Sequence, residues 1–299
     1  MSLIRIHHKT VYRYNKPVSF GEHRLMFRPR DSHDLRHVNS TMTISPKPAI
    51  RWKHDVFGNS IAVATFSDAA SELVFESNVT VEQYASTVDM PIAPRGQKLP
   101  VAYTTDELDD LGRSRIRHYP DPDGTLERWT RGFLDRDGTG DTLNILTAMT
   151  REISSTFGYE PRMDEGTRPP VETLALGVGA CRDFALLMME AVRTLGIAAR
   201  FVSGYLYDPA ADNGGDALRG ADATHAWLQV YIPGCGWIEF DPTNGIVGGT
   251  NLIRVGVTRD PSQAVPVSGT YFGQPDDFID LSVEVSVRAV DAREHITTS

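Results

Sequence analysis

Cysteine is scarce in this chain of 299 residues, which contains only Cys181 and Cys235. Domains that depend on disulfides are rich in cysteine, so this chain is not a disulfide scaffold. The sequence also lacks the CxxC and HExxH spacings of common metal sites, and its N-terminal histidines show no ligand spacing. We therefore expect neither a metal ion nor another cofactor.

Positive charge and long hydrophobic runs are also in short supply. The chain has 30 Lys and Arg against 39 Asp and Glu, a net charge of −9. Nucleic-acid binding needs a basic face, so we expect no nucleic-acid partner. No stretch approaches ~18 consecutive apolar residues, and the N-terminus has no apolar signal core. We expect a soluble, cytoplasmic protein with no membrane partner; its oligomeric state is not predicted.

Short β-like segments fill residues 1–104. Apolar and β-branched residues alternate with polar ones, and Pro-, Asn- and Asp-containing turns separate the segments. Many short strands with such turns are typical of a β-sandwich. We therefore predict a β-rich, sandwich-like N-terminal domain over residues 1–104.

The pattern changes after this region. Proline and acidic residues interrupt any periodicity over residues 105–124, which we predict to be a linker. Helical periodicity followed by strand-like segments predicts an α+β core over residues 125–262. Residues 263–299 contain further strand-like segments, which we expect to pack back on either domain.

Cys181 lies at the start of a strongly predicted helix. A turn with Gly177 and Gly179 precedes it, and an apolar run over residues 184–195 follows until Gly196. A helix N-terminus offers unpaired N–H groups and a partial positive charge, which favour the ionised, reactive form of a thiol. The dipole contributes only about 0.3–1 kcal/mol, so a cationic partner must provide most of the activation.

His225 and Asp241 form the pair that provides this activation. A turn at residues 233–236 joins a predicted strand that contains His225 to a strand that ends at Asp241. Neighbouring strands lie ~5 Å apart, so the two side chains can meet. The imidazole can then face the thiol while the carboxylate fixes its tautomer and orientation and stabilises the imidazolium.

Each of these residues also has a purely structural interpretation. Cys181 alone would be a buried, inert cysteine, His225 a polar residue in a core strand, and Asp241 a turn former before Pro242. The three together, in this order and in these settings, favour a nucleophile, a base and an orienting group.

The motifs around the three residues resemble the transglutaminase-like superfamily. The segments that carry the resemblance are Gly179-Ala180-Cys181-Arg182-Asp183-Phe184-Ala185, Thr224-His225-Ala226-Trp227 and Gly236-Trp237-Ile238-Glu239-Phe240-Asp241-Pro242-Thr243-Asn244. The N-terminal part and the tail around residues 269–271 resemble a bacterial subgroup with an added N-terminal β-rich domain.

This resemblance implies a papain-like α+β core, with the cysteine-bearing helix packed on an antiparallel sheet, preceded by the β-sandwich-like domain. It implies a thiol mechanism on amides and assigns the nucleophile to Cys181, the base to His225 and the orienting group to Asp241.

One feature of animal transglutaminases is missing, an upstream tryptophan that helps to stabilise the oxyanion. No tryptophan lies between Trp129 and Trp227. The backbone N–H of Cys181 is one natural oxyanion donor, and Tyr159 is our candidate for the second. A core aromatic residue with a hydrogen-bonded hydroxyl is the alternative interpretation of Tyr159.

Other residues near the three receive structural predictions. We expect Asp183 to stabilise the first helical turn or to contact a nearby loop. Trp227 is expected to lie on the opposite side of its strand from His225. The loops at residues 160–172 and 208–222 are expected to border the cleft.

These observations predict a thiol-dependent amide-bond hydrolase, a cysteine protease or amidase that acts through a thioester acyl-enzyme. Water is the acceptor that is always present, which favours hydrolysis of a peptide or isopeptide bond. Transfer to an amine, as in a transglutaminase, is one alternative; a non-catalytic binding or scaffold protein that retains the fold is another. The sequence identifies no substrate beyond a peptide or protein amide.

Overall fold

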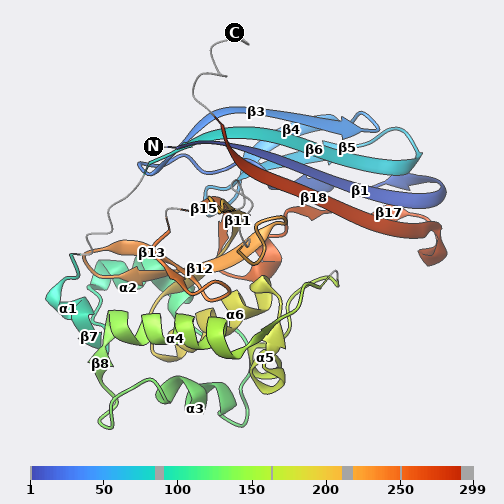
Figure 1. Cartoon of the computed structure of the whole chain (residues 1–299). Helices are drawn as coiled ribbons and strands as arrows, with labels where there is room; N and C mark the ends of the chain where they lie inside the picture. Colours follow the sequence, from blue (N-terminus) through green and yellow to red (C-terminus); the bar gives the residue numbers. More distant parts are fainter. Residues whose placement is uncertain (1, 85–90, 163, 211–217, 250, 291–299) are drawn as a thin grey trace.

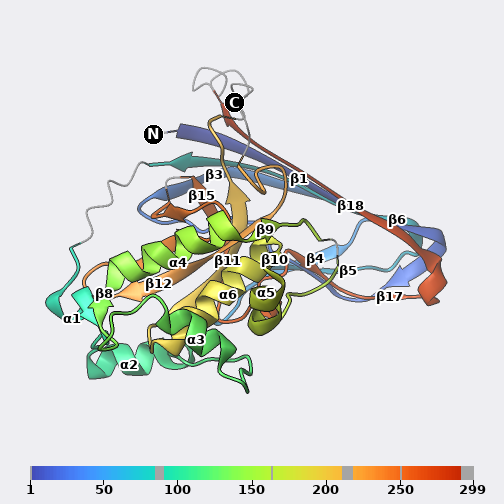
Figure 2. The same cartoon turned by 60° about the horizontal axis from the view of Figure 1, so that its bottom comes forward.

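The computed structural model describes residues 2–84, 91–162, 164–210, 218–249 and 251–290. The N-terminal strands form a β-sandwich of two sheets. A separate antiparallel sheet within residues 199–258, called the second sheet below, lies next to the sandwich (Figure 1). Helices cover the far side of this second sheet (Figure 2). The predicted α+β fold with a β-rich N-terminal region is confirmed.

Two sheets make up the N-terminal sandwich. The larger has the strand order β17-β1-β6-β3, with β18 also paired to β1, and the smaller has the order β16-β2-β5-β4. Apolar side chains from both sheets, such as Ala64 and Phe75, are buried together in the sandwich core. Ile4 and Val63 lie in a separate cluster that also contains Ile253 of the second sheet. The strands are β1 (Ser2–Phe20), β2 (His23–Leu25), β3 (Leu35–Ser45), β4 (Ala49–His54), β5 (Ser60–Thr65), β6 (Ala70–Gln83), β16 (Val267–Ser268), β17 (Tyr271–Phe272) and β18 (Phe278–Val290).

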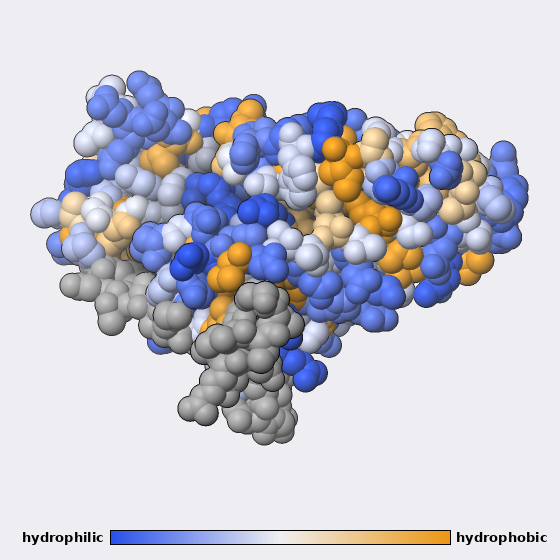
Figure 3. All heavy atoms as spheres, turned by 90° about the horizontal axis from the view of Figure 1, so that it is seen from above, coloured by the Kyte–Doolittle hydropathy of each residue, from blue (hydrophilic) through white to orange (hydrophobic). Residues whose placement is uncertain are grey.

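The C-terminal strands therefore belong to the N-terminal sandwich. β18 runs antiparallel to β1 from Leu3, opposite Val290, to Tyr14, opposite Phe278. Seen from above, the surface on this side of the molecule is mostly hydrophilic, with hydrophobic residues in separate patches (Figure 3).

The second sheet has the strand order β14-β13-β12-β11-β15, and all its pairs are antiparallel. Its strands are β11 (Ala199–Leu206), β12 (His225–Ile232), β13 (Gly236–Asp241), β14 (Ile246–Val247) and β15 (Leu252–Thr258). The helices on its far side are α3 (Thr125–Arg131), α4 (Thr142–Thr156), α5 (Pro170–Leu176) and α6 (Cys181–Thr194). The predicted hairpin with its turn at residues 233–236 joins β12 to β13.

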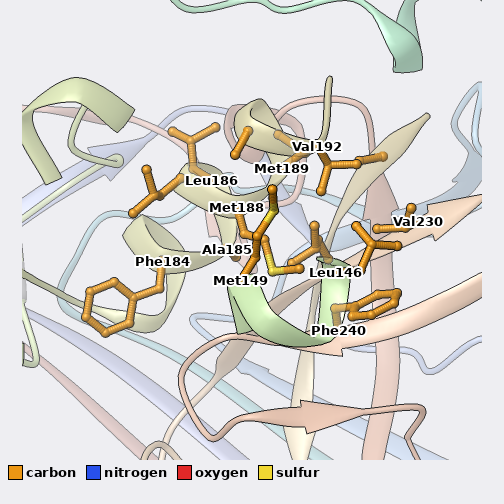
Figure 4. Packing of buried hydrophobic residues seen from close by; sticks show 14 of the residues in the cluster. Leu146, Met149, Phe184, Ala185, Leu186, Met188, Met189, Val192, Val230 and Phe240 are labelled. Carbon is orange, nitrogen blue, oxygen red and sulfur yellow. The ribbon is translucent and has the colours of Figure 1, made fainter. Parts of the chain in front are cut away.

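Helix α6 is the centre of the second core. Nearly every side chain from Cys181 to Arg193 is buried, because α6 packs on the sheet with one face and on α3, α4 and α5 with others. Leu146 and Met149 of α4 meet Met188 of α6, and Phe240 closes the cluster from the sheet (Figure 4). The buried charged side chains of α6 are paired, such as Glu190 with Arg193, as a helix in this central position requires.

Residues 105–124, which we predict to be a linker, include regular secondary structure. They contain α2 (Thr105–Leu111) and a 3-10 turn over Gly112–Arg115. Thr104 and Glu107 form a capping box that fixes the start of α2. The short elements around this region are α1 (Pro94–Gln97), β7 (Lys98–Leu99) and β8 (Gly140–Asp141).

Polar contacts as well as apolar packing join the sandwich to the second sheet. Burial lowers the pKa of His8 on β1 to about 4, and its Nδ1 lies 2.8 Å from the Tyr205 hydroxyl of β11. Because this imidazole is neutral, the tyrosine hydroxyl can donate to it. The Asn59 side chain forms two 2.9 Å hydrogen bonds with the backbone of Val257 on β15. None of the described helices has the length and apolar character needed to cross a membrane.

Candidate active site

Cys181 is the first residue of α6 and is placed by a short strand that precedes the helix. α5 ends at Leu176 and is capped by Gly177, whose φ of 62° is the left-handed conformation that favours glycine. The chain then forms β10 (Val178–Gly179), which pairs in parallel with β9 (Gly158–Tyr159), and enters α6. Cys181 is buried with 9% of its surface exposed.

His225 and Asp241 lie at neighbouring ends of two paired strands. His225 begins β12 and Asp241 ends β13, and the pairing of Leu228 with Phe240 sets their register. His225 Nε2 lies 2.8 Å from Asp241 Oδ2, and both side chains are fully buried. The structure thus brings together the two residues that the hairpin was predicted to place side by side.

The charges at this pair are strongly coupled. Burial alone lowers the pKa of an imidazole, but Asp241 and Cys181 more than offset this and raise the pKa of His225 to about 10. Burial raises the pKa of a carboxyl group, but hydrogen bonds and the charge of His225 hold the pKa of Asp241 below its usual range. At neutral pH the pair is therefore an imidazolium and a carboxylate.

The other ring nitrogen of His225, Nδ1, is the one available to the thiol of Cys181. Nδ1 is buried and has no nitrogen or oxygen partner among the described residues, while Cys181 interacts with the ring and raises its pKa. One nitrogen is therefore held by Asp241 and the other is left for Cys181. This is the arrangement that an imidazole needs to exchange a proton at a sulfur.

The loop that follows β9 is fastened to the start of α6. Asp183 accepts hydrogen bonds from the backbone N–H groups of Ala180 and Arg168, at 2.9 and 2.8 Å. The Arg162 guanidinium binds both oxygens of the same carboxylate, at 2.8 Å at the shortest. Asp183 thus has both of the roles expected for it: it stabilises the first turn of α6, and it binds a nearby loop.

Arg182 also binds this loop. Its guanidinium donates to the carbonyl oxygens of Arg162, Asp164 and Gly166, at 2.6 to 3.2 Å. These contacts place the loop between β9 and α5 next to the N-terminus of α6; of the loop predicted at residues 160–172, the last three residues belong to α5. Residue 163 of this loop and residues 211–217 of the loop at 208–222 lie outside the described residues.

Comparisons with known proteins identify the family of both parts of the chain. The family model for the bacterial transglutaminase-like N-terminal region matches residues 4–82, and that for the transglutaminase-like superfamily matches residues 134–242. An uncharacterized protein of Mycobacterium tuberculosis is 31% identical over 94% of this chain and 91% of its own length. The chain belongs to the transglutaminase-like superfamily. The resemblance found in the sequence motifs is confirmed.

Further relatives cover the same length. An uncharacterized protein of Mycobacterium leprae is 26% identical over 95% of this chain and 98% of its own. A crystal structure from Cytophaga hutchinsonii, described as a candidate cysteine protease, has a TM-score of 0.71 and 18% identity. It covers 97% of this chain and 91% of its own chain, so this transglutaminase-like chain shares its fold over both parts.

Tyr159, the candidate second oxyanion donor, lies beside the chain that leads to Cys181 in this transglutaminase-like core. It is paired with Gly179 in the β9–β10 ladder. Burial, together with the charges of Cys181, Asp222 and Asp241, raises the pKa of Tyr159 to about 12. The phenol therefore stays protonated at neutral pH and keeps a proton to donate.

Trp227 is on the same side of its strand as His225, and the prediction of opposite sides was wrong. Residues two positions apart on a strand share a face. The two rings stack with centroids 5.9 Å apart and an interplanar angle of 25°. The indole N–H donates to Glu239, which also binds Arg254, and Arg254 pairs with Asp34 of the N-terminal sandwich. A continuous set of contacts therefore leads from the sandwich to the imidazole.

Sequence reasoning missed two residues that contact the transglutaminase-like site. Asn244 binds Asp241, and the signal was its position three residues later in a motif already singled out. Arg162 binds Asp183, but nothing in its polar loop distinguished it from the other arginines there. No cluster of three or more His, Cys, Asp or Glu in the described ranges could hold a metal ion.

Proposed function

We propose that this protein is a thiol-dependent hydrolase of amide bonds, a cysteine protease or amidase. The observation that carries this proposal is the buried 2.8 Å contact between His225 and Asp241 beside Cys181 at the N-terminus of α6. This contact gives the imidazole a fixed orientation, and the helix N-terminus favours negative charge on the sulfur.

The reaction begins at the sulfur of Cys181. The thiolate attacks the carbonyl carbon of an amide, and the carbonyl π electrons move to the oxygen. The backbone N–H of Cys181 and the Tyr159 hydroxyl are the proposed donors to this oxyanion. The C–N bond then breaks, and the imidazolium of His225 gives its proton to the leaving nitrogen, which leaves a thioester.

Water completes the cycle. His225, now neutral, takes a proton from water as the oxygen attacks the thioester carbonyl. The C–S bond breaks, a carboxylic acid leaves, and the thiolate and imidazolium are restored. Asp241 remains ionised throughout and keeps Nε2 protonated, so that Nδ1 is the nitrogen that exchanges the proton.

A scaffold protein without catalysis is the less favoured function. Burying an ion pair costs desolvation free energy, and apolar residues of similar size stabilise a core at least as well. His225 and Asp241 have fully buried side chains. Retaining such a pair next to a cysteine at a helix N-terminus fits a chemical role better than a structural one.

A peptide library tests hydrolysis against amine transfer. The library is incubated with the wild type or with Cys181→Ala in H₂¹⁸O that contains an excess of a simple primary amine, methylamine. We expect products of the wild type to carry ¹⁸O in new carboxyl groups, and we expect none with Cys181→Ala. Dominant N-methylamides would show transfer instead, and identical profiles for the two proteins would contradict any amide chemistry of this thiol on peptides.

A further inference from the structure

Asn244 makes a contact that reaches the proposed catalytic pair directly. Its Nδ2 donates to Asp241 Oδ2 at 2.9 Å, the same oxygen that contacts His225 Nε2. The other oxygen of Asp241 accepts from the backbone N–H of Thr243 at 2.9 Å. Of these donors to the carboxylate, Asn244 is the one that a side-chain substitution can remove without changing the proposed triad.

The same amide holds a second segment of the chain. Asn244 Oδ1 accepts from the backbone N–H of Arg219 at 3.0 Å, and Nδ2 donates to the Arg219 carbonyl oxygen at 3.2 Å. Two acceptors and one donor therefore face the amide. They fix its orientation, because a flipped amide would set its oxygen against a carboxylate and a carbonyl.

Gly220, the next residue after Arg219, lies against the imidazole. Its φ is +84°, and a Cβ added at this position would be 2.7 Å from His225 Nδ1 and 3.5 Å from Cε1. The first distance is well inside van der Waals contact. A side chain at residue 220 would therefore occupy space beside the nitrogen that faces the thiol.

Arg219 extends from this point towards Tyr159. Its guanidinium donates to the Ser154 carbonyl oxygen at 3.4 Å and lies 6.0 Å from the centre of the Tyr159 ring. The segment held by Asn244 thus spans the distance between the Asp241–His225 pair and the proposed oxyanion donor.

We propose that Asn244 is a positioning residue of this site. Its amide fixes Asp241 against His225 and at the same time holds the Arg219–Gly220 segment over the Nδ1 side of the ring. The inference rests on the proposed roles of Cys181 and His225 as nucleophile and base.

The test compares how fast iodoacetamide modifies Cys181 in five single variants of the full chain between pH 5 and pH 10. Cys235 in the same chain is the internal reference, and peptide mass spectrometry separates the two sites. The site variants are Asn244→Ala, Asn244→Asp and Gly220→Ala. The matched controls are Asn15→Ala, a remote asparagine, and Gly138→Ala, whose φ is +80° with nothing within 4 Å of an added Cβ.

We expect Asn244→Ala to slow the modification of Cys181 by about tenfold or more at pH 7. The difference in rate from the wild type should narrow near pH 10, where unassisted thiols ionise. Asn244→Asp keeps an acceptor for the Arg219 N–H but puts a carboxylate against Asp241, so it should be at least as slow. Gly220→Ala should be slow as well, while Gly138→Ala and Asn15→Ala react like the wild type. Circular dichroism establishes that each variant is folded.

Rates within twofold of the wild type in both Asn244 variants would overturn the proposal. So would a normal rate in Asn244→Asp with a slow Asn244→Ala, because only the loop contact would then matter. Slow Asn244 variants in a protein that hydrolyses no amide would support the positioning role and contradict the hydrolase. A wild-type Cys181 that reacts no faster than Cys235 would overturn both.

Discussion

His225 is the residue whose protonation changes the stability of the folded protein with pH. Its pKa is raised from an unfolded value near 6.5 to about 10 in the folded protein. A raised pKa contributes stability that is fully present below the unfolded value and is lost as the pH rises through the folded value. The folded state therefore loses this contribution between about pH 6.5 and pH 10.

His225→Gln makes this dependence measurable. We expect the difference in unfolding free energy between the wild type and this variant to shrink from pH 6.5 to pH 10 in urea titrations. His54→Gln, at an exposed position on β4, should show no such trend. A difference for His225→Gln that stays constant or grows with pH would contradict the ion pair.

Arg162 and Asp183 form the second pair that matters at this scale. Asp183 has no exposed side-chain surface and Arg162 has 10%. Arg162→Met leaves a buried carboxylate without its counter-charge, so we expect a loss of about 3 kcal/mol or more in unfolding free energy. Arg131→Met removes an exposed pair with Glu127 and should cost under about 1 kcal/mol. Equal small losses in urea denaturation would show that the loop is not fastened through this pair.

At the scale of elements, the sequence predicted what local patterns determine. Helix α6 follows from the apolar run over residues 184–195 between two glycine-containing turns, and the β12–β13 hairpin follows from its turn. α2 was missed because it buries only Leu111 and shows little apolar periodicity, although Thr104 and Glu107 cap it. The contacts of Asn244 with Arg219 join segments 25 residues apart in the sequence, and local patterns do not contain them.

Helix α6 begins with the proposed nucleophile, so its packing determines where Cys181 lies. Leu187 is fully buried in the cluster around α6, whereas Leu176 of α5 has 54% of its surface exposed. We expect Leu187→Ala to cost about 2–5 kcal/mol in unfolding free energy, because it leaves a cavity. Leu176→Ala should cost under about 0.5 kcal/mol. Similar costs for the two in urea denaturation would contradict the central position of α6.

At the scale of the whole molecule, the chain closes on itself. β18 completes the sheet that begins with β1, so the two ends of the described chain share one sandwich. The sequence left the partner of residues 263–299 open, because pairing of Leu3 with Val290 has no local signature. Contacts through Trp227, Glu239 and Arg254 then connect this sandwich to the proposed active site.

Two positions on β18 test whether this strand is part of the sandwich core. Val287 has 8% of its surface exposed and Val283 has 38%, on the same face of the strand. Val287→Asn buries an amide that has no hydrogen-bond partner, so we expect it to lower the unfolding free energy by about 2 kcal/mol. Val283→Asn should have a small effect. Thermal unfolding followed by circular dichroism measures both. Equal midpoints would show that β18 does not seal the core.

The most direct test of the central claim is the reactivity of the two thiols in one chain. Iodoacetamide is added near pH 7 to the wild type and to His225→Ala, and mass spectrometry follows Cys181 and Cys235 separately. We expect Cys181 to react at least about tenfold faster than Cys235 in the wild type, and to lose this advantage in His225→Ala, because the imidazolium favours the thiolate. Equal, slow labelling of both cysteines in the wild type would contradict the claim that Cys181, His225 and Asp241 act together.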